Sequence, residues 1–205
     1  MSVRERIKKL RYHLALGRKR IARIVGFNTR RRRAIKRLRD ELGSRVMFDS
    51  VTIEEIPKNA DAVAGYTGGN WPTYWELVKR FPHASVLDIA IAASYDATCL
   101  DIESGDASPE EAPSWVRRQQ ARGVKRPVVY TSASQMDELL ALLRRAGIGR
   151  HEVRVWTAHY TFAPHLCGPH TCGEVQSTTA DATQWTDQAL GRNLDQSLLH
   201  EGFFG

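Results

Sequence analysis

The chain has 205 residues, of which 42% are hydrophobic, so it is long enough for one sizeable core and a small appendage. No apolar run approaches the roughly 18 residues that a transmembrane helix needs, and the N-terminus is too charged for a secretory signal. We therefore expect a protein that is made in the cytoplasm without a signal peptide or a transmembrane segment.

The net charge of +7 is unevenly distributed along the chain. Residues 1–45 hold 17 Lys and Arg against 3 acids, whereas residues 46–205 hold 13 against 20. This change in charge predicts a domain boundary near Gly43 and Ser44.

Residues 1–45 are predicted to form a basic amphipathic helical extension. Ser2 and Glu5 fit a capping box, and Ile7, Leu10 and Leu14 recur at helical spacing. A basic helical surface suits an anionic polymer, an anionic membrane surface or nucleic acid, and it equally suits packing on a partner protein or on the acidic body. The sequence leaves these alternatives open.

Residues 46–205 alternate between short apolar runs and amphipathic stretches. Helices are predicted over 71–80, 109–122 and 134–146. This alternation predicts an α/β fold with parallel strand pairs, specifically a small, incomplete (β/α) TIM-like barrel of about eight strands with fewer helices. The predicted strands are 46–51, 62–67, 85–92, 98–103, 127–132, 153–160, 181–186 and 194–199.

Asp101 and Glu103 are the first candidate site residues. Alternate side chains of a strand share one face, so the two carboxylates point the same way with stems about 6.6 Å apart. Paired carboxylates at such separations cleave glycosidic bonds, although an acidic strand end that begins a solvated loop has the same pattern. Their expected place at the carboxyl end of a barrel strand favours the catalytic interpretation.

Further polar and aromatic residues are predicted at the same rim. Asp49 lies in the first predicted strand and Asp195 in the last, and closure of a barrel makes those strands neighbours. Each aromatic residue could belong to the core, but aromatic faces beside acids also suit a sugar ring. The candidate substrate-binding residues are Tyr66, Tyr130, Trp156, Tyr160, Gln184 and Trp185.

The order of motifs over residues 46–205 resembles the glycoside hydrolase family 25-like domains of actinobacteria and actinophages, a branch of the lysozyme-type muramidases. The resemblance is carried by the segments MFDSV, VAGYTGG, LDIESGDASPEEAPSW, PVVYTS, VWTAHY, ATQWTD and NLDQSLL. It implies a barrel with fewer helices than strands, no cofactor, and hydrolysis of the β-1,4 bond after N-acetylmuramic acid in peptidoglycan.

The resemblance also implies a role for each carboxylate. Glu103 would donate the proton to the leaving oxygen, and Asp101 would stabilise charge at the anomeric centre or orient the acetamido group of the substrate. Asp195 matches the Asp of the last strand. The first strand departs from the usual Gly-x-Asp pattern, and we assign its role to Asp49.

These expectations define competing functions. The leading one is a peptidoglycan-cleaving glycosidase, such as a phage lysin or a tail-associated wall hydrolase, that binds glycan strands and acts at the cell wall after release or as part of a phage particle. The alternatives are a non-catalytic glycan-binding or structural relative, and a nucleic-acid-binding protein that uses residues 1–45.

Cysteine and histidine gather in one Pro- and Gly-rich stretch that holds His165, Cys167, His170 and Cys172. The spacing is a poor match to the usual paired zinc ligands, so no metal is expected. A disulfide between Cys167 and Cys172 would hold the loop, and similar loops in the resembled family suggest that pairing. Free thiols and a zinc site remain alternatives.

Overall fold

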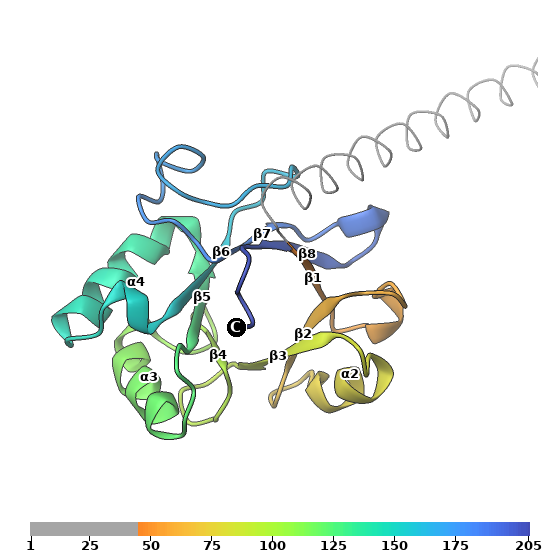
Figure 1. Ribbon diagram of the computed structural model, residues 1–205, viewed down its shortest axis with the longest axis horizontal. Coiled ribbons are helices and arrows are strands. Elements are labelled where there is room, and N and C mark those ends of the chain that lie inside the picture. The colour runs from red at the N-terminus through yellow and green to blue at the C-terminus, as the bar shows by residue number, and fades with distance from the viewer. Residues whose placement is uncertain (1–44) are drawn as a thin grey trace, which may run out of the picture.

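The computed structural model describes residues 45–205, which form a closed barrel of eight strands (Figure 1). The predicted N-terminal helical extension lies outside the described residues. Neighbouring strands from β1 to β7 are parallel, whereas β8 is antiparallel to both β7 and β1. The strands are β1 Arg45–Asp49, β2 Ala62–Tyr66, β3 Ser85–Ala90, β4 Cys99–Asp101, β5 Val128–Ser132, β6 Arg154–Ala158, β7 Ala182–Thr186 and β8 Asp195–Leu199.

Few helices cover this barrel. Figure 1 shows the labelled α-helices beside β2 to β6. Among the described residues, no helix is long and apolar enough to cross a membrane. The α-helices are α2 Tyr74–Arg80, α3 Ala112–Ala121 and α4 Ala133–Arg145, and the 3-10 turns are η1 Ile53–Glu55, η2 Pro109–Glu111, η3 Arg150–Glu152 and η4 Ala189–Gly191.

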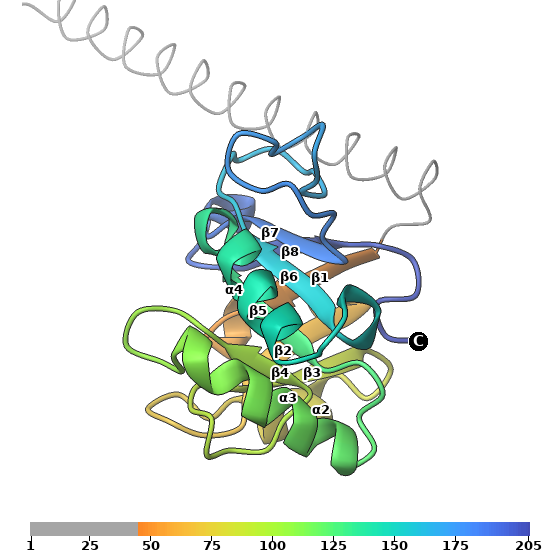
Figure 2. The same cartoon turned by 90° about the vertical axis from the view of Figure 1, so that its left-hand side faces the viewer.

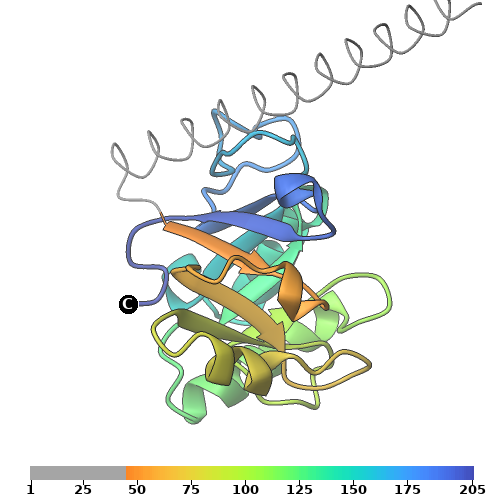
Figure 3. The ribbon, with the colours of Figure 1, turned by 90° about the vertical axis from the view of Figure 1, so that its right-hand side faces the viewer.

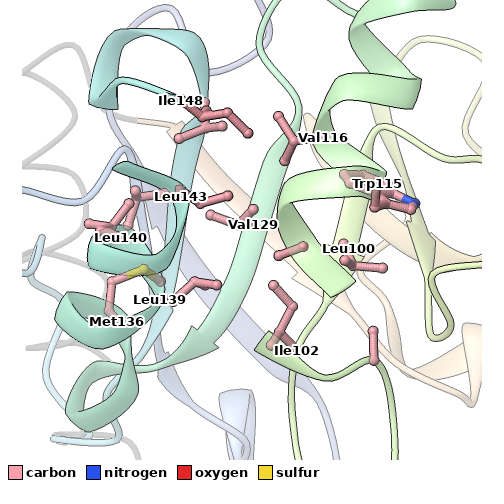
Figure 4. Packing of buried hydrophobic residues seen from close by; sticks show 14 of the residues in the cluster. Leu100, Ile102, Trp115, Val116, Val129, Met136, Leu139, Leu140, Leu143 and Ile148 are labelled. Carbon is pink, nitrogen blue, oxygen red and sulfur yellow. The ribbon is translucent and has the colours of Figure 1, made fainter. Parts of the chain in front are cut away.

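Helices α3 and α4 pack on the outer face of β4 to β6 and build the largest apolar cluster (Figure 4). Trp115 of α3 and Leu139 and Leu143 of α4 are almost fully buried there, close to Val129 of β5. Apolar residues at helical spacing produce this face, because positions three and four apart lie on one side of a helix. The indole nitrogen of Trp115 donates a hydrogen bond to the carbonyl oxygen of Tyr95 at 2.9 Å.

The C-terminal residues lie at the end of the barrel where β1 begins and β8 ends. Phe203 is buried in the cluster that fills the barrel interior, beside Met47 and Leu199. Arg154 donates a hydrogen bond to the carbonyl oxygen of Gly205. Figure 1 accordingly marks the C-terminus near the barrel axis, so the opposite end, where the parallel strands finish, is left for a site.

Two features differ from the sequence-based predictions. The strand predicted over 98–103 ends at Asp101, although the amide of Ile102 still donates to the carbonyl of Tyr130 at 2.9 Å. The expected parallel pairing is wrong for β8, which lies alongside β1 in the opposite direction (Figure 3). The short connection through η4 explains this reversal, because a parallel return to the same sheet needs a long crossover.

Candidate active site

Four carboxylates meet at the carboxyl end of the parallel strands. Asp49 ends β1, Asp101 ends β4, and Glu103 follows two residues later. Asp195 opens β8 and reaches the same end because β8 is antiparallel, and it is the direct partner of Asp49 in the strand register. Local strand geometry and barrel closure therefore bring together acids that are up to 146 residues apart in the sequence.

These acids line one small cavity of about 90 Å³. All of the predicted catalytic residues line it, as do all of the predicted substrate-binding residues except Trp185. The lining residues are Asp49, Tyr66, Ile89, Asp101, Glu103, Tyr130, Trp156, Tyr160, Gln184 and Asp195.

Trp185 corrects the predicted set of site residues. It is fully buried and does not line the cavity, whereas its neighbour Gln184 does. Consecutive residues of a strand point to opposite faces, so the two side chains cannot both face the site.

The buried aromatic residues form the floor of the cavity. Tyr130 and Trp156 are 6% and 1% exposed, and their ring centroids lie 4.4 Å apart. The indole nitrogen of Trp156 donates to the Ser197 hydroxyl at 3.0 Å. Tyr160 is the most exposed of the aromatic lining residues, at 45%.

A chain of hydrogen bonds orients the amide of Gln184. The Tyr130 hydroxyl donates to Gln184 Oε1 at 2.7 Å, and Gln184 Nε2 donates to the Tyr160 hydroxyl at 3.1 Å. Gln184 also hydrogen-bonds to Asp195. This amide therefore connects the aromatic floor to one of the four carboxylates.

Burial dominates the electrostatics of the acids. It raises the pKa of Asp101 to about 8, with further contributions from the charges of Glu103 and Asp106, while the Tyr66 hydrogen bond acts in the opposite direction. The pKa of Glu103 is also raised, first by burial and then by Asp106 and Asp195. The lining residues include no Lys or Arg, whose positive charges would lower these pKa values.

Individual oxygen atoms of these acids differ in their contacts. Asp101 Oδ2 accepts a hydrogen bond from the Tyr66 hydroxyl at 3.2 Å. Asp101 Oδ1 and Asp49 Oδ2 are buried, and neither has a hydrogen-bond partner among the described residues. Two buried carboxyl oxygens at the site therefore have hydrogen-bonding capacity that the described residues do not satisfy.

Two further depressions follow one another outward from the cavity. One, of about 260 Å³, shares Glu103 and Tyr160 with it. The other, of about 490 Å³, shares His159 and Val175 with the first and is lined by the connection between β6 and β7. This connection projects from the barrel in Figure 2, and it forms one wall beside the barrel mouth.

Cys167 and Cys172 form a disulfide within that connection. Both cysteines are buried, and the half-buried His159 and His165 lie against them. His170, which the sequence placed in the same cluster, is exposed and lies apart from the other four.

Two residues near the site were not predicted to act there. One is Asp106, whose charge contributes to the raised pKa values of Asp101 and Glu103. His159 was missed because it precedes the window that holds the cysteines. The spacing His-x5-His-x-Cys-x4-Cys is the signal that would have included it.

Comparisons with known proteins do not identify the chain. No protein-family model matches it, and neither the curated proteins nor the solved structures contain a significant match.

Proposed function

We propose that residues 46–205 form a glycoside hydrolase that cleaves the glycan strands of peptidoglycan in the manner of a muramidase. The single observation that carries the proposal is the convergence of Asp49, Asp101, Glu103 and Asp195 in one cavity with an aromatic floor. Paired carboxylates beside aromatic rings are the groups that glycosidic hydrolysis requires. The closed barrel with few helices is compatible with a reduced (β/α) barrel of the TIM type.

Glu103 is the proton donor in this mechanism. It lines both the barrel cavity and the adjoining depression, so it lies where a sugar chain could reach it. Its raised pKa favours the protonated form that a general acid needs. Glu103 passes its proton to the glycosidic oxygen as the bond from that oxygen to the anomeric carbon breaks. Water then adds to the anomeric carbon and returns a proton to Glu103.

Asp101 positions the substrate in the same mechanism. Tyr66 holds one of its oxygens, and the other, Oδ1, has no partner among the described residues. This oxygen can accept a hydrogen bond from the acetamido group of an N-acetylated sugar. In its ionised form Asp101 stabilises the positive charge that develops at the anomeric carbon.

A second candidate function is glycan binding without cleavage. The cavity of about 90 Å³ is smaller than the roughly 300–1,000 Å³ typical of ligand sites. A sugar would then occupy the wider depressions beside Glu103 and Tyr160.

Residues 1–45 are assigned a separate role in this proposal. Their excess of 14 positive charges would hold the protein to an anionic wall polymer, an anionic membrane surface, a partner protein or nucleic acid. The enzyme would act at the cell wall after release or as part of a phage particle. Binding to a polyanion should weaken steeply with added salt, as counterion release predicts.

Release of reducing ends from purified peptidoglycan by the full chain tests the two functions. We expect activity in the wild type, a loss of about 10²- to 10⁴-fold in Glu103→Gln, and no loss in Glu110→Gln. Glu110 is an exposed acid on the nearby turn η2 and serves as the matched control. Binding to peptidoglycan without new reducing ends, unchanged in Glu103→Gln, would favour the glycan-binding function.

A further inference from the structure

The connection between β6 and β7 brings four side chains of metal-binding type to one point. They are His159, His165, Cys167 and Cys172, and their nitrogen and sulfur atoms all lie within 4.8 Å of one another. None of these residues belongs to the carboxylate cavity. The cluster therefore needs an explanation other than the proposed glycosidase chemistry.

Four of the six separations between these atoms are close to those of a tetrahedral metal site, whereas the two sulfurs are joined by the disulfide and must move apart on reduction. His159 Nδ1 lies 3.1 Å from His165 Nε2, 3.2 Å from Cys172 Sγ and 3.6 Å from Cys167 Sγ. His165 Nε2 lies 3.7 Å from Cys167 Sγ. Ligand atoms around a tetrahedral Zn²⁺ with ordinary Zn–N and Zn–S bonds are about 3.3 to 3.8 Å apart.

Hydrogen bonds outside the cluster orient His165 as a ligand. Its Nδ1 lies 2.9 Å from the carbonyl oxygen of Ala163, to which it donates. The ring is then the tautomer whose Nε2 carries a lone pair, and this atom faces His159 and Cys167. Histidine ligands of metals are commonly held by such a contact from the other ring nitrogen.

The backbone fixes Cys167 against the barrel. Its amide donates to the hydroxyl of Thr183 on β7 at 2.8 Å, and its carbonyl accepts from the amide of Ala180 at 2.8 Å. The amide of Cys172 donates to the carbonyl of Gly168 at 2.9 Å, which closes the turn between the two cysteines. The backbone at both cysteines is thus held by contacts that do not involve the disulfide.

We infer that reduction of the Cys167–Cys172 disulfide converts this cluster into a Cys₂His₂ site that binds one Zn²⁺ ion. A dithiol or phosphine reductant supplies two electrons, and each sulfur gains a proton as the S–S bond breaks. Zn²⁺ then displaces the two thiol protons and binds both thiolates and the two imidazole nitrogens. A dithiol reductant is converted into its cyclic disulfide. A phosphine reductant takes an oxygen atom from water and becomes the phosphine oxide.

The disulfide form and the Zn²⁺ form of the cluster both hold the connection between β6 and β7 in place. His159 and Cys172 line the depression of about 490 Å³, so the cluster holds one wall beside the barrel mouth. A disulfide joins the cysteines in an oxidising environment, and Zn²⁺ joins the same cysteines to both histidines in a reducing one. The site is independent of whether the barrel cleaves or only binds a glycan.

Metal binding by the untagged full chain tests the inference directly. The protein is reduced with tris(2-carboxyethyl)phosphine without oxygen and titrated with Co²⁺, then with Zn²⁺. We expect one equivalent of Co²⁺ with the visible bands of a tetrahedral ion and a thiolate charge-transfer band, all displaced by Zn²⁺. The oxidised protein should show no thiolate band.

Single substitutions assign the ligands. Cys172→Ser and His165→Asn should each weaken Co²⁺ binding by more than about 100-fold, because loss of an outer contact alone costs about 10- to 100-fold. His170→Asn, which changes an exposed histidine of the same loop, should bind as the wild type does. Near-ultraviolet circular dichroism checks folding, and His165→Asn keeps both cysteines if Cys172→Ser fails to fold.

Several results would overturn the inference. One is a reduced wild-type protein that does not bind one equivalent of Zn²⁺. Another is an octahedral Co²⁺ spectrum without a thiolate band. Equal Co²⁺ affinity in the wild type and in folded His165→Asn would show that the metal binds elsewhere.

Discussion

Asp49 and Asp195 lie directly opposite each other on β1 and β8, and their carboxyl groups share a hydrogen bond. Burial is the largest cause of the raised pKa of Asp49, followed by the charge of Asp195. The pair therefore holds a proton that either residue alone would lose more readily. Closure of the barrel creates this pair, because β1 and β8 are neighbours only in the closed sheet.

Replacing Asp49 with Asn should stabilise the fold at neutral pH. The Asn amide can still donate to Asp195, and it has no proton to lose, so the free energy of unfolding at neutral pH should rise. Asp49→Ala removes the donor as well and should be less stable than Asp49→Asn. Urea unfolding of the three proteins measures the difference. Equal stability of the Asn and Ala variants would show that the hydrogen bond contributes nothing.

The pH dependence of stability should identify Asp101. Its pKa rises from about 3.8 in the unfolded chain to about 8 in the folded protein. The folded state therefore binds this proton more tightly, so the contribution of Asp101 to stability is fully present below about pH 4 and is lost as the pH rises towards about 8. At pH 7 the loss amounts to on the order of a few kcal/mol.

Asp101→Asn should remove most of that slope, and the variant should be more stable than the wild type at pH 7 but not at pH 4. The matched control is Glu110→Gln, in which an exposed acid is changed. Chemical denaturation across this pH range compares the three proteins. A slope that is the same in Asp101→Asn as in the wild type would assign the pH dependence to other acids.

Tyr130→Phe should disturb the site through Gln184. The Tyr130 hydroxyl is a buried donor to Gln184 Oε1, so its removal should cost about 1–3 kcal/mol of stability. It should also lower glycosidase activity, because Gln184 contacts Tyr160 and Asp195. Tyr95→Phe, at a side chain that is 44% exposed, should change stability by less than about 0.5 kcal/mol. Urea unfolding and reducing-end release measure both effects.

Sequence reasoning located the strands and most of the site for a definite physical reason. A strand buried on both sides of a covered barrel is a short apolar run between turns, and such runs are visible in the sequence. Asp49, Asp101 and Gln184 lie in or at the end of such runs. The direction of β8 was not predictable in this way, because parallel and antiparallel strands share the same two-residue periodicity.

The remaining differences also have physical causes. Gln184 and Trp185 were both placed in the site because they end the same strand, but consecutive residues point to opposite faces. The predicted strand extended to Glu103, yet pairing ends at Asp101 and Glu103 reaches the cavity from the following turn. His159 was not grouped with the cysteines because it precedes the Pro- and Gly-rich stretch that holds them, and the fold returns that stretch to it.

Asp106→Asn should shift the pH profile of the proposed glycosidase. The charge of Asp106 helps to raise the pKa of Glu103, so its removal makes Glu103 lose its proton at lower pH. Because the general acid must be protonated, the basic limb of kcat/KM on soluble peptidoglycan fragments should move to lower pH. Asp106 lies at the surface, so added salt should reduce the shift. Glu110→Gln should leave the limb in place, and an unmoved limb in Asp106→Asn would show that Glu103 does not set it.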